Sequence, residues 1–164
     1  MIKGKHAAYA FVIAAVMVFC FAGCAENPGI QGGDFIEQKT LADSFAARGN
    51  TTAALSGDEA LDLTGAEING RKEIFLNNNT LKLTGSLAVS QNGVIDLKPG
   101  EGFSDGVIDL SELEFVFPDG LSGYPDDMAI IEIRSGISII EPSANDYITI
   151  RDFGILVSIN VYKP

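Results

Sequence analysis

Thr80-Leu-Lys-Leu-Thr-Gly-Ser-Leu-Ala-Val-Ser-Gln-Asn-Gly-Val-Ile-Asp-Leu97 is the stretch that decides the fold. Apolar and polar residues alternate along it in short runs, and glycine or asparagine closes the runs. Alternation with a period of two is typical of β-strands that bury one face, whereas a helix repeats about every 3.6 residues. Similar punctuation extends from Leu61 to about Gly120, so the sequence predicts a mainly β domain of short strands.

Two short motifs recur within this region. Gly93-Val94-Ile95-Asp96-Leu97 returns thirteen residues later as Gly106-Val107-Ile108-Asp109-Leu110, and Leu63-Thr64-Gly65 returns twenty residues later as Leu83-Thr84-Gly85. Self-similarity with glycine turns indicates stacked strands, each burying its apolar face against its neighbours. If the two pentapeptides stack on one another, Asp96 and Asp109 lie in one ladder.

The stretch from Thr80 to Leu97 resembles the rungs of right-handed β-helices in bacterial surface proteins, and the resemblance covers residues 61 to 120. It implies a short β-solenoid, which is the fold that we expect. The alternative is a β-sandwich, because a meander of hairpins produces the same turns and accommodates their uneven spacing.

The segments on either side complete the predicted domain. Leu41 and Phe45 lie four residues apart within residues 34–48, and Gly49 follows, which indicates a short amphipathic helix that caps the open end of the β-structure. A long loop rich in proline and glycine occupies residues 117–127. Four strands rich in isoleucine and valine are predicted after it, at 129–134, 137–141, 147–151 and 155–162.

The N-terminus has the pattern of an export signal. Lys3 and Lys5 precede an uncharged apolar run, which is shorter than the ~20 residues of a membrane-spanning helix. The run ends in Phe21-Ala22-Gly23-Cys24, which resembles the lipobox of bacterial lipoproteins, with Phe21 in place of the usual leucine. The alternatives are an ordinary secretory signal cut near Ala22 or Ala25 and an uncleaved anchor.

The lipobox resemblance implies a signal peptide at 1–23 and an acylated Cys24, by which the protein would bind membrane lipid. Residues 24–33 then comprise this cysteine and a flexible tether, followed by a single β-rich domain at 34–164. Ala25 stands where an aspartate would retain an enteric lipoprotein at the inner membrane. We therefore expect a location in the bacterial cell envelope, with the outer membrane favoured.

Composition excludes several classes of function. The net charge is −11 and becomes −13 once Lys3 and Lys5 leave with the signal, so nucleic acid is not an expected partner. His6 and Cys20 lie in the signal and Cys24 would be acylated. The processed chain then cannot form a disulfide, a Ser-His-Asp triad, a Cys-His dyad or a zinc site of histidine and cysteine.

Carboxylates are the remaining candidates for a ligand site. Asp96 and Asp109 would form the ladder described above, and Tyr124, Asp126 and Asp127 lie on the long loop. Oxygen clusters of this kind suit Ca2+, although no EF-hand loop is present, and outward polar side chains beside turns explain the same residues. No other metal or cofactor is expected.

These observations predict a non-catalytic envelope lipoprotein that acts as a surface or periplasmic binding or adhesion module for a protein or glycan. A structural role in the envelope is the first alternative. A polysaccharide lyase or glycosidase is the second, with Lys98, Arg134 or Arg151 as a base beside an acidic residue.

Overall fold

The computed structural model describes residues 40 to 163. The chain divides into two units, residues 1–36 and 37–164, and all the described residues belong to the second. The predicted signal peptide, the Phe21-Ala22-Gly23-Cys24 motif and the tether lie outside the described residues, as does the first part of the predicted helix at 34–48.

The helix α1 (Leu41–Ala46) opens the described domain. The Thr40 side chain caps its first turn by accepting a hydrogen bond of 3.2 Å from the Asp43 backbone N–H. Leu41 and Phe45, the pair that predicted the helix, are both buried. The helix ends before the extended residue Ala47, so the prediction that Gly49 closes it was wrong. Lys72, buried under this end, holds the carbonyls of Ala47 and Gly49 instead.

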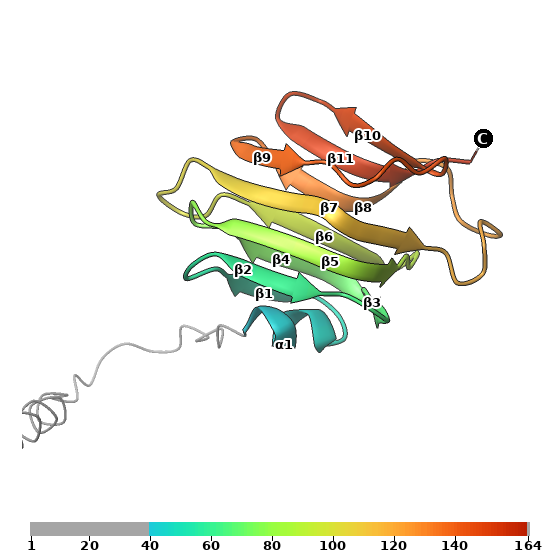
Figure 1. Cartoon of the computed structure of the whole chain (residues 1–164), viewed down its shortest axis with the longest axis horizontal. Coiled ribbons are helices and arrows are strands. Elements are labelled where there is room, and N and C mark those ends of the chain that lie inside the picture. The colour runs from blue at the N-terminus through green and yellow to red at the C-terminus, as the bar shows by residue number, and fades with distance from the viewer. Residues whose placement is uncertain (1–39, 164) are drawn as a thin grey trace, which may run out of the picture. The chain divides into compact units, whose positions relative to one another are not determined.

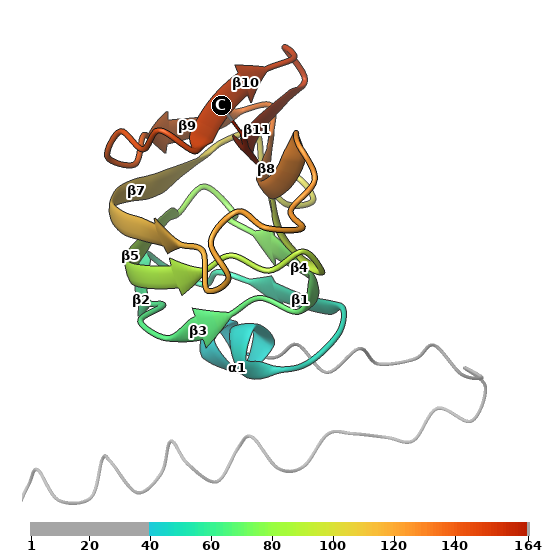
Figure 2. The same cartoon turned by 90° about the vertical axis from the view of Figure 1, so that its right-hand side faces the viewer.

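Eleven strands follow, and they form two sheets. The six-stranded sheet has the order β1 (Thr51–Ala54), β4 (Gly70–Phe75), β6 (Gly93–Lys98), β8 (Met128–Arg134), β11 (Leu156–Val161) and β10 (Ile148–Asp152). The five-stranded sheet has the order β2 (Glu59–Asp62), β5 (Thr80–Ala88), β7 (Gly106–Val116) and β9 (Ile137–Ile140), with β3 (Ala66–Glu67) also paired to β5. The chain from β4 to β9 alternates between the two sheets, which form two layers in Figures 1 and 2.

All pairs among β1 to β9 are parallel, and only β8, β11 and β10 pair in antiparallel fashion. One passage of the chain through both sheets is called a circuit below. Along the six-stranded sheet Thr51 pairs with Lys72, Gly70 with Gly93 and Ile95 with Ile131, which gives circuits of 21, 23 and 36 residues. The added length lies in the loops at 99–105 and 117–127. The parallel pairing differs from the hairpin meander of the alternative prediction.

The core lies between the two sheets and consists mainly of stacked aliphatic side chains. Ile74 pairs with Leu97, and Leu97 with Ile133, on the inner face of the six-stranded sheet, and all three are at most 1% exposed. Leu81 and Ile108 form the same kind of stack on the facing sheet. Burial of each such side chain contributes roughly 1.5–3 kcal/mol, so the period-two pattern of the sequence accounts for the main stabilising term. The mainly β prediction is confirmed.

The two copies of the thirteen-residue repeat lie in different sheets, so they do not stack on one another in neighbouring strands. Its first copy begins β6 in the six-stranded sheet, and its second copy begins β7 in the five-stranded sheet. In both copies the isoleucine and leucine point into the core and the aspartate points outward. The expected ladder of Asp96 and Asp109 was therefore wrong, because thirteen residues carry the chain through about half a circuit.

The four strands predicted after the long loop correspond closely to β8, β9, β10 and β11. Figure 1 shows that the strands of β1 to β9 stack roughly in chain order from α1 upward, with β10 and β11 at the far end. Among residues 40–163, no helix has the length and apolar character needed to cross a membrane.

Candidate functional site

A ladder of charged side chains lies on the outer face of the six-stranded sheet, the face turned away from the other sheet. Glu73 of β4 pairs in register with Asp96 of β6, and Asp96 pairs with Glu132 of β8. The inward neighbours of Asp96, Ile95 and Leu97, are fully buried, so strand alternation directs the carboxylate outward. Bases stand two residues from these acids on the same strands, and the complete set is Arg71, Glu73, Asp96, Lys98, Glu132 and Arg134. This set is called the charged ladder below.

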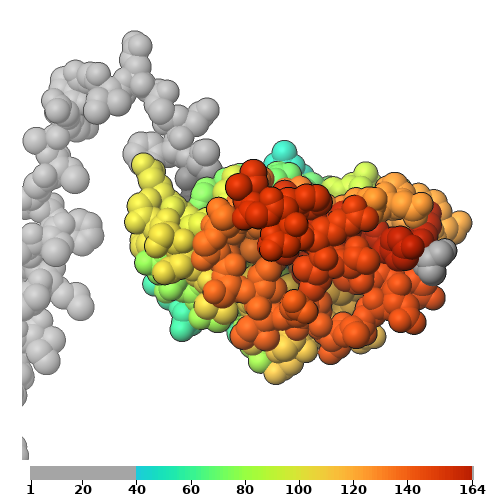
Figure 3. Space-filling view, turned by 90° about the horizontal axis from the view of Figure 1, so that it is seen from above, coloured from blue at the N-terminus to red at the C-terminus, as the bar shows by residue number. Residues whose placement is uncertain are grey.

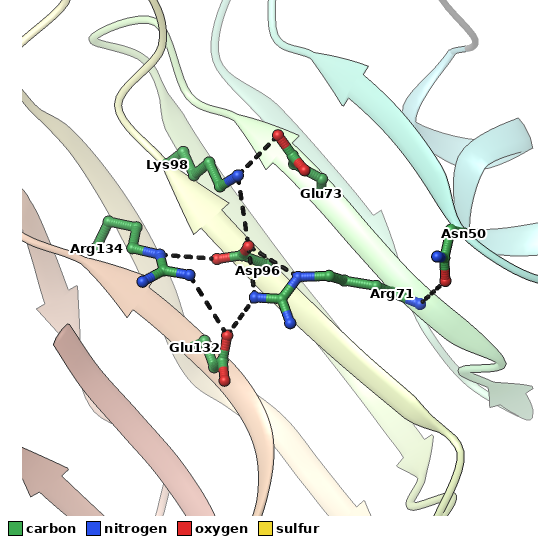
Figure 4. A network of polar contacts seen from close by, with 7 residues as sticks. All are labelled: Asn50, Arg71, Glu73, Asp96, Lys98, Glu132 and Arg134. Atoms are coloured by element: carbon green, nitrogen blue, oxygen red, sulfur yellow. Dashed lines mark hydrogen bonds and ion pairs between the residues drawn. The ribbon is translucent and has the colours of Figure 1, made fainter.

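Asp96 is the centre of the charged ladder. Its side chain is only 1% exposed and accepts hydrogen bonds from Arg71 Nε at 3.0 Å and Arg71 Nη2 at 2.7 Å. Arg134 Nε donates to its other oxygen at 3.2 Å, and Lys98 Nζ lies 3.6 Å away. Figure 4 shows the three cations converging on this carboxylate from three strands. A buried carboxylate is stable only when it is compensated in this way.

The remaining acids complete the charge balance. Glu132 accepts a hydrogen bond from Arg71 and lies 3.7 Å from Arg134 Nη2, while Glu73 pairs with Lys98 at 2.8 Å. Three acids thus meet three bases. Hydrogen bonding to Asp96 is the main cause that raises the pKa of Arg71, so the guanidinium stays charged. The charged ladder is therefore a fixed, electrically neutral surface.

A metal ion at Asp96 would compete with three cationic side chains already beside the carboxylate. Within the described part of the chain, no group of three or more histidine, cysteine, aspartate or glutamate side chains is placed to hold a metal ion. The charged ladder consequently suits recognition of a polar surface better than cation binding.

A shallow depression of about 360 Å³ lies beside the charged ladder. Its lining includes the amide side chains of Asn50, Gln91 and Asn92 together with Arg71 and Glu132. The Arg71 backbone N–H donates to the Asn50 side chain at 2.9 Å, which fixes this amide. The side chains of Gln91 and Asn92 are exposed and make no hydrogen bond to any residue from 40 to 163. The depression therefore presents unused amide donors and acceptors next to a rigid guanidinium. We refer to it as the amide depression.

Glycines at two strand starts form part of the floor of the amide depression. Gly70 and Gly93 pair with each other in adjacent strands. A Cβ on Gly93 would lie 2.0 Å from the Ile68 carbonyl oxygen, and one on Gly70 would lie 2.4 Å from the Gly49 carbonyl carbon. Only glycine permits this close approach of successive circuits.

Asp109 lies on the outer face of the opposite sheet and is not part of the charged ladder. It accepts hydrogen bonds from the Ser111 backbone N–H at 2.9 Å and the Ser111 hydroxyl at 2.7 Å, and Lys82 Nζ lies 3.9 Å away. The Ser111 bonds are the main cause that lowers the pKa of Asp109. The structure thus gives Asp109 a local role at a strand irregularity.

Tyr124, a candidate ligand residue on the long loop, is buried and does not extend into solvent. Its hydroxyl donates to the Val89 carbonyl oxygen at 2.8 Å, and its ring packs edge to face on Phe117 with centroids 5.8 Å apart. Burial is the main cause that raises the pKa of Tyr124. The apolar ring closes one end of the core because the strands stop there and leave it uncovered.

The two loop aspartates differ in their surroundings. Asp126 is exposed, and none of residues 40–163 pairs with its carboxylate. Asp127 has a backbone φ of 63° and forms an ion pair with Arg151 of β10. The predicted candidates Asp96, Asp109, Tyr124 and Asp127 therefore have separate surroundings, and the structure does not join them in one site.

Sequence reasoning missed Gln91, Asn92 and the pairing of Arg71 with Glu132. One signal was present in the sequence, because Asn69-Gly70 returns as Asn92-Gly93 after 23 residues, which is the register of β4 on β6. Arg71 and Glu132 lie 61 residues apart, and no repeat marks their spacing.

Comparison of the chain with protein-family models, with curated proteins and with solved structures gave no match.

Proposed function

We propose that the protein is a non-catalytic binding module of the bacterial cell envelope, anchored by lipid on Cys24 at the outer membrane. Residues 1–23 serve as the signal peptide, and residues 24–33 comprise the acylated cysteine and a tether to the domain at 34–164. The support for this anchor is the Phe21-Ala22-Gly23-Cys24 pattern behind a short apolar run. More than one acyl chain would be needed for stable attachment.

The domain is proposed to be a short β-solenoid capped by α1. Parallel pairing in consistent chain order and alternation between two sheets support this class of fold. Repeated circuits build an extended, rigid face, and exposed edges of such stacks are covered by capping elements. In this protein Leu41 and Phe45 of α1 cover the first circuit.

The observation that carries the binding function is the amide depression beside the charged ladder. Exposed amides, the Arg71 guanidinium and the Glu132 carboxylate offer hydrogen-bond donors and acceptors at fixed positions. Vicinal hydroxyl groups of a saccharide need this combination. The overall charge of −11 disfavours an acidic glycan, so a neutral glycan is the proposed ligand class.

Glycan binding is tested with the full chain and an array of neutral and acidic oligosaccharides. The double variant Gln91→Ala, Asn92→Ala removes two exposed amide side chains that make no hydrogen bond to any residue from 40 to 163. We expect it to weaken binding of a neutral glycan at least tenfold, while Ser143→Ala, in a groove beside β7, changes nothing. Equal binding by wild type and the double variant would overturn the assignment of the site. Absence of any glycan binding, with envelope attachment retained, would favour the structural role.

The anchor is tested separately by mass spectrometry of Cys24 and by fractionation of cells carrying Cys24→Ala. We expect acyl chains on the wild-type cysteine and loss of membrane retention in the variant. Normal retention of Cys24→Ala would contradict lipid anchoring. Protease access on intact and permeabilised cells then distinguishes a surface module from a periplasmic one.

A further inference from the structure

The two sheets end unevenly at the C-terminal end of the stack. β8 and β9 belong to the same circuit, since β8 pairs with β6 and β9 pairs with β7. The six-stranded sheet continues beyond β8 with β11 and β10, whereas the other sheet ends at β9. Figures 1 and 2 show β11 at about the level of β9 and β10 beyond it, and Figure 3 looks down on this end of the molecule.

The inner face of the overhanging strands is apolar and only partly covered. Ile150 of β10 pairs with Ile159 of β11 and therefore lies on the same face. Ile159 is fully buried, but Ile150 is 38% exposed. Ile148, on the same face of β10, is partly buried. Among residues 40–163, the hydrophobic strip on β10 thus lacks the facing strand that covers the inner faces of the earlier strands.

β9, beside this strip, has a free edge, because no strand among residues 40–163 pairs with the side that faces away from β7. It pairs with β7 on one side and is the last strand of its sheet, so alternate backbone N–H and C=O groups point away from β7. No side chain of β9 is buried, and Ile140 is 48% exposed. The strand carries no charge and no proline, which are devices that commonly protect an edge from pairing.

The space next to β9 suits a single strand better than a second copy of this domain. The same end of a second copy would bring strands of both sheets. At this place β10 already provides one of the two layers, so only one strand beside β9 is needed to complete the other layer. The net charge of −11 on each copy also opposes self-association. Three exposed acids lie on or next to β9 and β10 in the sequence: Glu141, Asp146 and Asp152. Basic residues of a partner would complement their charge.

We propose that the free edge of β9 and the apolar strip of β10 together bind one extended segment of a partner protein, with alternating aliphatic residues and flanking lysine or arginine. Its backbone pairs with β9, and its aliphatic side chains cover Ile148 and Ile150. This is recognition by strand addition, in which backbone bonds give affinity and side-chain pockets give specificity. It rests on observations separate from those for the amide depression.

The test uses the full chain and the synthetic peptide Lys-Val-Ser-Ile-Thr-Val-Lys, labelled for fluorescence anisotropy. Two further peptides carry backbone N-methyl groups on the second, fourth and sixth residues or on the third and fifth. Only one set of N–H groups faces β9 in a paired strand, so we expect one methylated peptide to bind at least tenfold more weakly than the other. Equal binding by the two methylated peptides, or no binding of the parent peptide, would overturn strand addition.

Variants of the protein locate the contact. Ile150→Asp should weaken binding of the parent peptide at least tenfold, while Phe103→Asp, at a residue of similar exposure in the loop at 99–105, should leave it unchanged. Equal weakening by both variants would contradict the proposed surface. Sedimentation of the protein alone tests the other occupant, because a dimer that Ile150→Asp abolishes would replace the partner segment with a second copy.

Discussion

Asp96 and Asp109 occupy the same position in two copies of one pentapeptide, yet their side chains leave different sheets on the two outer faces of the domain. The Asp96 side chain is 1% exposed and takes hydrogen bonds from two arginines. Asp109 is 17% exposed and is held mainly by Ser111 two residues away. Equivalent positions in the sequence thus have a long-range role in one copy and a local role in the other.

Replacement of Asp96 by asparagine should destabilise the domain by about 2–3 kcal/mol. Loss of one partner from a buried ion pair costs roughly 3–5 kcal/mol, and partial exposure of Arg71 and Arg134 reduces this value through solvent screening. Urea unfolding measures the change. Asp109→Asn is the control from the second copy of the repeat and should have a much smaller effect. Equal losses in the two variants would show that Asp96 is not the centre of a stabilising network.

Gly70 and Gly65 separate the effect of crowding from that of backbone conformation. Their φ values are 79° and 75°, but only Gly70 would place a Cβ against neighbouring backbone, at 2.4 Å from Gly49. Gly65→Ala should cost about 1–2 kcal/mol through left-handed strain alone. Gly70→Ala should cost clearly more, because two circuits must also move apart. Similar melting temperatures for the two variants would contradict a tight contact between circuits.

Much of the fold followed from period-two alternation, because that pattern determines which side chains point into the core. Leu81 and Leu83, for example, alternate with polar residues in the sequence, and both are fully buried. The pattern carries no information on which sheet a strand joins. The sheet that a strand joins depends on the length of the circuit. The loops at 99–105 and 117–127 lengthen the circuit from 21 residues to 36.

The candidate site was harder to predict, because the sequence pattern does not reveal which strands become neighbours. The Asn-Gly dipeptides at residues 69 and 92 mark the pairing of β4 with β6, but the step from Asp96 to Glu132 crosses two irregular loops. Tyr124 was named as a candidate ligand residue because it lies on a long loop rich in proline and glycine. Its burial could not be inferred without knowing that the core is open beside β5 and β7.

The pH dependence of stability should reveal the carboxylates of Asp62 and Asp109. Hydrogen bonds from Thr64 and Ser111 lower their pKa values in the fold. The unfolded chain therefore takes up protons at higher pH, so this stabilisation is complete above the ordinary aspartate pKa of about 3.9 and is lost as pH falls through the folded values. At pH 7 the wild type should melt at a higher temperature than the double variant Asp62→Asn, Asp109→Asn. The melting temperatures of the two proteins should converge toward pH 2.

Asp126→Asn is the control for the loss of a carboxylate. The Asp126 side chain accepts no hydrogen bond from the residues that the structure describes, so the variant should melt at the wild-type temperature at pH 7. A difference between wild type and the double variant that stays constant from pH 7 to pH 2 would mean that the two carboxylates do not cause it.

Lys72 should fasten the helix α1 to the first circuit. It is fully buried on the inner side of β4, and its Nζ donates to the carbonyl oxygens of Ala47 at 2.6 Å and Gly49 at 2.8 Å. Lys72→Met keeps a similar apolar stem but leaves these two carbonyls without their charged donor. Hydrogen bonds to charged groups contribute roughly 1.5–3 kcal/mol, so we expect a loss of about 2 kcal/mol or more.

Hydrogen exchange distinguishes a local fastening from general stabilisation by Lys72. In Lys72→Met, residues 41–49 should exchange faster under native conditions, while β8 and β11 keep the slow exchange of the core. Lys82→Met is the matched control, since Lys82 lies on the outer face of β5 and pairs with Glu112 at 2.6 Å. If exchange rises equally in α1 and in β8, Lys72 supports the whole core and α1 is not held as a separate cap.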